Sequence, residues 1–128
     1  TVAYGCYRRV VTYLQDTAMT ELAERHCAPC EGGTQPMNAS DVADRLGQLS
    51  DRWTSDGDAK IVGQFKFKNY YHTQAFVNAV AYIAHCEDHH PDITFGYNQC
   101  TIELTTHAIN GLSDNDFISA AKIDRLVD

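Results

Sequence analysis

The strict alternation of side chains in QCTIELTTH, residues 99–107, constrains the fold more than any other feature of this chain. Successive side chains of a β-strand point to opposite faces, so a strand with one buried face alternates apolar and polar residues. The apolar face here consists of Cys100, Ile102 and Leu104. The segment KIVGQFKFK at 60–68 alternates in the same way, and DITFGY at 92–97 is a shorter strand-like stretch. These segments predict a sheet with one buried and one exposed face.

Segments with helical spacing lie around these strands. One begins near Ser40, a suitable N-cap for SDVADRLGQL. A second runs over roughly 70–88 behind the cap Asn69, and a third covers 113–127. The turn SDGD at 55–58 precedes the first clear strand. The order helix, strand, strand, helix, strand, strand, helix predicts a two-layer α+β domain, in which a four-stranded antiparallel sheet carries three helices on one face.

The length of 128 residues suits a single domain, whose body we place at residues 39–128. Residues 1–38 are assigned to an N-terminal extension and loop, because CAPCEGGTQPMNAS at 27–40 is rich in turn-forming residues. Within this part, we interpret residues 1–18 as an extension outside the core, since Met19 resembles a natural start.

The charge of the chain excludes two classes of partner. A net charge of −7 and a pI near 5.2 argue against a nucleic-acid surface and against an anionic membrane. No apolar run approaches the ~20 residues of a membrane span, and the N-terminus lacks the apolar core of a signal peptide. We therefore expect a cytoplasmic protein.

The five cysteines do not indicate a disulfide framework, because their number is odd and they are scattered. Cys86 and Cys100 are expected to be small buried hydrophobic residues. HCAPC contains His26, Cys27 and Cys30, but a single C-x-x-C motif without a second pair is a weak zinc signal. We interpret this stretch as a flexible segment without a function.

The segment HCEDHHPDITFGY, residues 85–97, has three interpretations: a metal site, an acid/base centre, or the polar end of a helix. Pro91 ends the preceding helix, which places His89 at the helix end and His90 in the turn that follows. Adjacent histidines match neither the helical nor the strand spacing of zinc ligands. Histidine titrates near pH ~6.5 and therefore suits proton transfer at neutral pH. If the following strands form a hairpin, His107 returns toward the same place.

One further acidic residue has a local explanation. Ser113 and Asp116 have the S-x-x-D spacing of a capping box, and capping is the favoured role of Asp116 when it is considered alone.

The spacing of these residues resembles a known family signature. After His85 come three residues and then the run His89, His90 and Pro91. Tyr97 follows after five further residues, His107 after nine more, and Asp116 after another eight. This pattern is similar to that of the pterin-4a-carbinolamine dehydratase family, and the similarity covers residues 19–128. The start MTELAERHCAPC is also similar to bacterial members.

The resemblance implies a hydro-lyase that needs neither a metal nor an organic cofactor. Such enzymes dehydrate 4a-hydroxytetrahydropterin to quinonoid dihydropterin and so recycle the pterin of aromatic amino-acid hydroxylases. Members form homodimers or homotetramers. Animal members also act as dimerisation cofactors of a homeodomain transcription factor, so a non-catalytic coactivator-type binding module is the alternative function.

The resemblance also implies roles for individual residues. The catalytic residues are His89, His90 and His107. The substrate-binding residues are Asp88, His89, His90, Pro91, Thr105, Thr106, His107 and Ala108. Supporting residues are His85, Glu87, Tyr97 and Asp116.

One position departs from the commonest form of the family pattern. His85 stands where the family often has an acid, so we expect Glu87 or Asp88 to replace in part a carboxylate that would orient a catalytic ring. Our hypothesis assigns base and acid to His90 and His107, in an order that the sequence leaves open, and gives His89 a positioning role.

Overall fold

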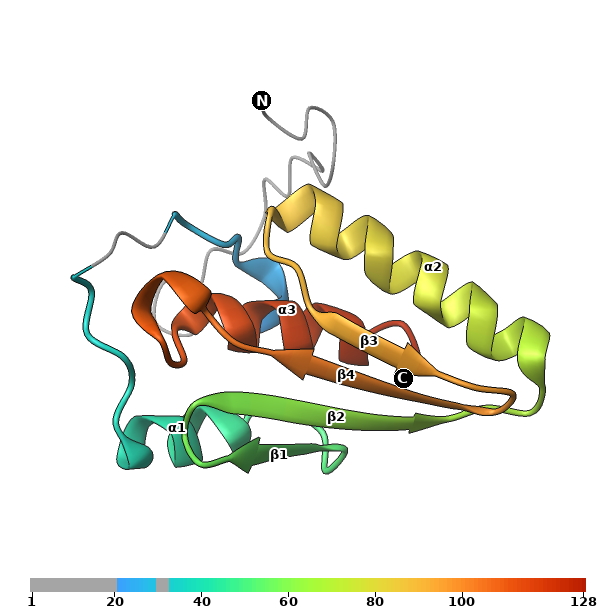
Figure 1. The fold of residues 1–128 in the computed structure, drawn as a ribbon, viewed down its shortest axis with the longest axis horizontal. Coiled ribbons are helices and arrows are strands. Elements are labelled where there is room, and N and C mark those ends of the chain that lie inside the picture. The colour runs from blue at the N-terminus through green and yellow to red at the C-terminus, as the bar shows by residue number, and fades with distance from the viewer. Residues whose placement is uncertain (1–20, 30–32) are drawn as a thin grey trace.

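The structure, a computed structural model, describes residues 21–29 and 33–128 (Figure 1). Its elements follow the predicted order. The helices are α1 (Ala39–Leu46), α2 (Tyr70–Glu87) and α3 (Asp114–Asp124), and the strands are β1 (Trp53–Asp56), β2 (Lys60–Lys66), β3 (Asp92–Phe95) and β4 (Gln99–Leu104). Two short 3-10 helices are added to this set, η1 (Leu22–Glu24) and η2 (His107–Ile109).

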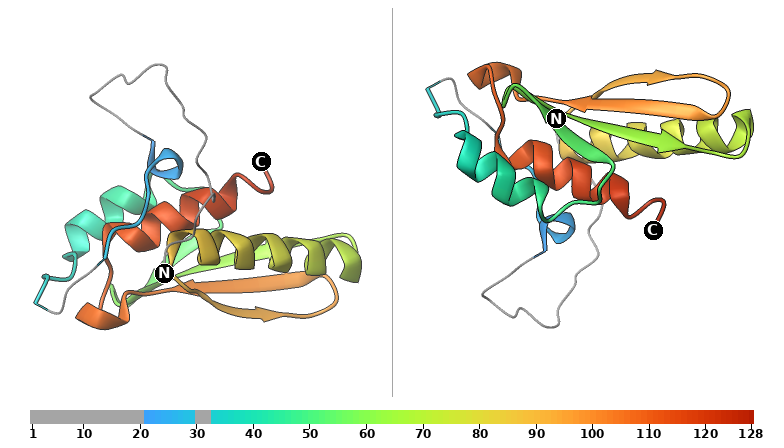
Figure 2. Two further views of the ribbon diagram at one scale, coloured as in Figure 1. Left: turned by 90° about the horizontal axis from the view of Figure 1, so that it is seen from above. Right: turned by 90° about the horizontal axis from the view of Figure 1, so that it is seen from below.

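The four strands form one antiparallel sheet in the order β1-β2-β4-β3. The predicted hairpin of β3 and β4 is present, with Phe95 opposite Cys100. Strand β4 occupies the centre beside β2, where Ile61 pairs with Leu104. The three α-helices lie on one side of the sheet (Figure 2), so the two-layer α+β prediction is confirmed.

The core lies between the sheet and the helices, as the alternation of apolar and polar residues along the strands predicted. Cys100, Ile102 and Leu104 are buried, while their neighbours in β4 are more exposed. Gly63 permits a close approach within this core, because a Cβ atom there would lie 2.9 Å from the rings of Phe65 and Trp53. The part of the chain that the structure describes holds no helix that combines the length and apolar character required to cross a membrane.

Side-chain caps define where two helices begin. Asn69 accepts a hydrogen bond from the His72 amide and caps α2, as the sequence predicted. The cap of α1 is Asn38 rather than Ser40: its side-chain oxygen accepts from the Asp41 amide at 2.9 Å. Ser40 lies one residue inside the helix, beyond the capping position, so that prediction was wrong.

The N-terminal part of the described chain packs on the domain. Leu22 is buried in the core, and Met37 packs against it. This differs from the expectation of a flexible segment at HCAPC, because residues 21–29 run along α3. Residues 1–18 and Cys30 lie outside the described residues, so the interpretation of 1–18 as an extension stays a prediction.

The expected role of one cysteine was wrong. Cys86 is half-buried near the end of α2 and is disulfide-bonded, so it is not simply a small buried hydrophobic residue. Cys100 is buried as a free thiol, in agreement with the sequence-based expectation.

Candidate active site

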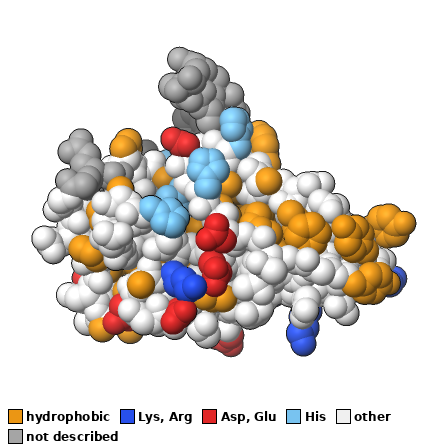
Figure 3. Space-filling view, viewed as in Figure 1, with side chains coloured by type: hydrophobic (Ala, Val, Ile, Leu, Met, Phe, Trp, Pro, Cys, Tyr) orange, Lys and Arg blue, Asp and Glu red, His pale blue; other side chains and the backbone are white. Residues whose placement is uncertain are grey.

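A cavity of about 480 Å³ lies where the end of α2, the end of β4 with η2, and the start of α3 meet residues 27–29. It gathers most of the residues that the resemblance marked. The described lining residues are Cys27, Ala28, Pro29, Cys86, Glu87, Asp88, His89, His90, Thr105, Thr106, His107, Ala108 and Asn115. On the face drawn in Figure 3, histidine side chains form a band from the end of α2 toward η2, with acidic side chains beside them.

Different local features of the backbone bring the three histidines to this cavity. Asp88 ends α2 in the left-handed conformation, with φ of 50°, so the chain turns sharply before His89. The β3–β4 hairpin then returns the chain, and η2 begins at His107. His90 and His107 are exposed, whereas the His89 side chain is 11% exposed. Two histidines therefore face solvent at the cavity and the third is held within the protein.

His89 is held by a buried carboxylate. Its Nε2 lies 2.6 Å from Oδ1 of Asp116, whose side chain is fully buried. The short distance is typical of a charge-assisted hydrogen bond. With Nε2 donating to the carboxylate, Nδ1 is the nitrogen of His89 that remains to exchange a proton or a hydrogen bond.

The other oxygen of Asp116 is also engaged. Oδ2 accepts from the Thr106 hydroxyl at 2.8 Å and from the Ser113 amide at 3.0 Å. The Ser113 hydroxyl lies 2.7 Å from that of Thr106, whose proton is directed to the carboxylate. The predicted capping box of Ser113 and Asp116 is present. The same carboxylate thus caps α3 and orients His89, which is a second role that the local pattern did not reveal.

Several residues singled out in the sequence lie elsewhere. Pro91, His85 and Tyr97 are not among the described residues that line the cavity. His85 is exposed on α2, and Tyr97 lies in the β3–β4 turn, at the opposite end of the hairpin from His89. Asp88 lines the cavity with an exposed side chain.

Glu87 lines the cavity but contacts another set of groups. Its carboxylate lies 3.1 Å from Nδ1 of His26, accepts from the Cys27 amide at 3.3 Å, and lies 3.7 Å from Nζ of Lys122. The buried carboxylate seen on a site histidine is that of Asp116, at a position far from the one where the family often has an acid.

Sequence reasoning missed the wall made by residues 27–29 and by Asn115. The HCAPC motif is the sequence signal that points there, and its interpretation as a segment without a function did not use it. Burial raises the pKa of the Cys27 thiol to about 11, and Glu87 adds to this, so Cys27 is a neutral thiol near pH 7. Such a thiol is a poor nucleophile. Within residues 21–29 and 33–128, no three His, Cys, Asp or Glu side chains are grouped as a metal site.

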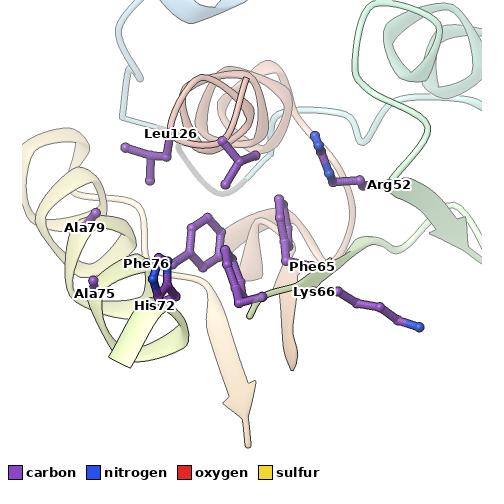
Figure 4. Close-up of a pocket in the computed structure, with 10 residues that line it drawn as sticks. Arg52, Phe65, Lys66, His72, Ala75, Phe76, Ala79 and Leu126 are labelled. Atoms are coloured by element: carbon purple, nitrogen blue, oxygen red, sulfur yellow. The ribbon is translucent and has the colours of Figure 1, made fainter. Parts of the chain in front are cut away.

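A second cavity, of about 530 Å³, lies between β2, the start of α2 and the C-terminal residues (Figure 4). Phenylalanine rings form its floor, with Phe65 and Phe76 4.7 Å apart between centroids. His72 is the histidine among its described lining residues. It lacks the set of proton-transfer groups found beside His89, so the smaller cavity is the better candidate for catalysis.

Comparisons with known proteins identify the same family that the sequence resembles. A family model described as pterin 4 alpha carbinolamine dehydratase matches residues 35–126. Relatives from Nitrosomonas eutropha and Nitrosospira multiformis, both provisionally named pterin-4-alpha-carbinolamine dehydratases, are 55% and 57% identical over 111 residues. Each match covers 87% of this chain, and 97% and 96% of the relatives.

Two solved structures resemble the fold. The crystal structure of a transcriptional coactivator/pterin dehydratase from Brucella melitensis has a TM-score of 0.69 and 30% identity, and the match covers 73% of this chain and all of that one. A pterin dehydratase-like protein, described as a RuBisCO assembly factor in the alpha-carboxysome, has a TM-score of 0.51 and 28% identity. That match covers 58% of this chain and 87% of the other.

Proposed function

The chain belongs to the pterin-4a-carbinolamine dehydratase family, and we propose that it dehydrates 4a-hydroxytetrahydropterin to quinonoid dihydropterin by histidine acid/base catalysis. The observation that carries this proposal is the meeting of His89, His90 and His107 at one cavity. Three imidazoles with different surroundings suit a reaction in which one proton is given and another is taken.

The reaction breaks two bonds in the substrate. The hydroxyl group leaves carbon 4a with its bonding electrons, and a proton given by the catalytic acid converts it to water. Nitrogen 5 loses its proton to the catalytic base, and the electron pair of that N–H bond forms the new double bond to carbon 4a. The enzyme gives one proton and takes one, so it needs no net proton and no oxidant.

We assign the two proton transfers to His90 and His107, because both rings are exposed at the cavity. His89 is the positioning histidine, since its Nε2 is occupied by Asp116 and its ring orientation is fixed. Each positioned acid or base contributes about 10²–10⁴-fold to such a reaction. No metal or organic cofactor takes part in the proposed steps.

The wider setting follows from the same family membership. We propose that the chain acts in the cytoplasm as a homodimer or homotetramer and recycles the pterin of an aromatic amino-acid hydroxylase. The supporting observations are the family match and the similarity to a pterin dehydratase structure.

A second candidate function is a binding module of the coactivator type. The Brucella protein is described as both a transcriptional coactivator and a pterin dehydratase, and the carboxysome relative is described as an assembly factor. The two functions are compatible on one chain. The cluster of histidines favours catalysis here, because a docking surface alone does not need a buried carboxylate that orients a ring.

The test is a stopped-flow assay of 4a-carbinolamine decay with and without the protein, from about pH 5 to 9, the range over which histidine titrates. We expect the protein to accelerate the decay throughout the middle of this range. A decay rate that is independent of the protein at every pH would contradict the enzyme function. A stable protein partner recovered by pull-down, together with no turnover, would favour the binding module.

A further inference from the structure

Residues 27–29, which we call the strap, form a wall of the active-site cavity although they belong to the N-terminal segment. Ala28 and Pro29 are exposed, so their side chains are available at the cavity rather than in the core. The other walls carry mostly hydroxyl, imidazole and carboxylate groups. Ala28 and Pro29, together with Ala108, are therefore the aliphatic side chains among the described lining residues.

Asn115 fastens the strap by a reciprocal pair of hydrogen bonds. Its Oδ1 accepts from the Ala28 amide at 3.0 Å, and its Nδ2 donates to the Ala28 carbonyl at 2.6 Å. One side chain thus satisfies both backbone groups of one strap residue, as a neighbouring strand would. Asn115 is buried and is the second residue of α3, directly before the Asp116 that orients His89.

Glu87 and Ser119 hold the preceding residue of the strap. The Cys27 amide donates to Glu87, and the Cys27 sulfur lies 3.6 Å from the Ser119 hydroxyl. The Glu87 side chain is 2% exposed and Ser119 is buried. Lys122 lies 3.7 Å from Glu87 and donates to the Ala23 carbonyl at 2.9 Å, which ties the segment leading to the strap to the same cluster.

These hydrogen bonds tie the strap to buried side chains of the domain. An isolated buried carboxylate is costly, and the amide of Cys27 is one of the groups that offset the cost for Glu87. The anchors lie on α2 and α3; His89 follows the end of α2 by two residues, and Asp116 lies on α3. The strap is thus fixed relative to the catalytic histidines by the same framework.

We propose that the strap is the substrate-positioning wall of the pocket: Ala28 and Pro29 contact the flat face of the bound pterin, and Asn115 and Glu87 are positioning residues that hold the strap in place. This inference rests on the proposed function. A pterin is a planar bicycle whose edges carry polar atoms and whose faces are less polar. Small-molecule sites combine apolar walls with a few polar groups in this way.

The test places a bulky side chain on the strap. Ala28→Phe fills the cavity from its wall, and its matched control is Ala43→Phe on α1, since both alanines are exposed and neither change alters the core. We expect Ala28→Phe to raise KM, and to weaken binding of the probe 7,8-dihydrobiopterin, by about tenfold or more, with an unchanged Tm. Ala43→Phe should leave all three values unchanged.

A second variant tests the anchor. Asn115→Ala should raise KM by about tenfold with a smaller change in kcat, and should speed hydrogen exchange at the Ala28 amide, which loses its acceptor. Probe binding should slow exchange at the Cys27 and Ala28 amides of the unmodified protein. If Asn115 served stability alone, Asn115→Ala would lower Tm with an unchanged KM, and probe binding would not slow exchange at the two amides of the unmodified protein.

The outcomes separate the two proposals. Normal turnover with the same KM in Ala28→Phe and in the unmodified protein would overturn the strap proposal alone. Probe binding that is lost in Ala28→Phe but kept in Ala43→Phe would support it even if no turnover were found. Absence of both turnover and probe binding in the unmodified protein would overturn both proposals.

Discussion

Replacing the buried carboxylate of Asp116 by an amide tests whether its contact with His89 serves catalysis. Oδ2 of Asp116 faces two donors, Thr106 and Ser113, so the oxygen of Asp116→Asn should take that side. The NH₂ group then faces Nε2 of His89, which must become an acceptor. The imidazole is thereby held in the other tautomer, with its proton on Nδ1.

The expected magnitudes follow from these contacts. A charge-assisted hydrogen bond contributes about 1.5–3 kcal/mol and a neutral one about 0.5–1.5 kcal/mol, so Asp116→Asn should lower the free energy of unfolding by about 1–2 kcal/mol. The dehydration rate should fall by about 10²–10⁴-fold, because a ring in the wrong tautomer cannot present the required nitrogen to the substrate. Urea unfolding measures the first value and stopped-flow decay of 4a-carbinolamine measures the second.

Asp124→Asn is the matched control. Asp124 is also buried on α3 and accepts from three donors, the Ser50 amide and hydroxyl and Trp53 Nε1 at 3.0 Å, but it contacts no histidine of the site. It should lose stability without losing rate under conditions where both variants remain folded. Equal rates for Asp116→Asn and the unmodified protein, or equal rate losses in the two variants, would refute the reasoning.

Three further predictions concern packing, capping and pH. Gly63→Ala should destabilise the protein by about 1–3 kcal/mol in urea unfolding, since its Cβ would lie 2.9 Å from two core rings; a change within error would mean that these rings relax freely. Asn69→Ala should cost about 1 kcal/mol through the lost cap of α2, and an unchanged Tm would show that this cap is not needed. Burial raises the pKa of the Cys27 and Cys100 thiols from 9.0 to about 11. The folded state therefore binds these protons more tightly, so stability should be intact below pH 9 and fall as the pH rises toward 11. Stability that stays constant over this range would contradict the assigned burial.

The fold could be predicted because its signals are local and periodic. Alternation around Ile102 identified the buried face of β4, and Asn69 marked the start of α2. The position of His107 followed from the hairpin, which needs only neighbouring strands. The start of α1 was misplaced because Asn38 and Ser40 are both good capping residues, and the sequence does not show at which of them the helix begins.

The contacts that shape the site are long-range, and the sequence does not show them. Asp116 has a complete local explanation as a capping residue, so its contact with His89, 27 positions away in the chain, was not visible. The strap is fastened by Asn115 across 87 positions. No periodicity or spacing rule connects such residues; the packing of α3 against α2 and against the N-terminal segment brings them together.

The most direct test of the central claim is the single-turnover rate of 4a-carbinolamine dehydration in His90→Ala, in His107→Ala and in the double variant. His72→Ala is the control, because His72 is exposed and lies at the other cavity. We expect each site variant to lose about 10²–10⁴-fold, the double variant to lose less than the product of the two, and His72→Ala to retain the full rate. Near-normal rates in both single variants would contradict acid/base catalysis by these histidines.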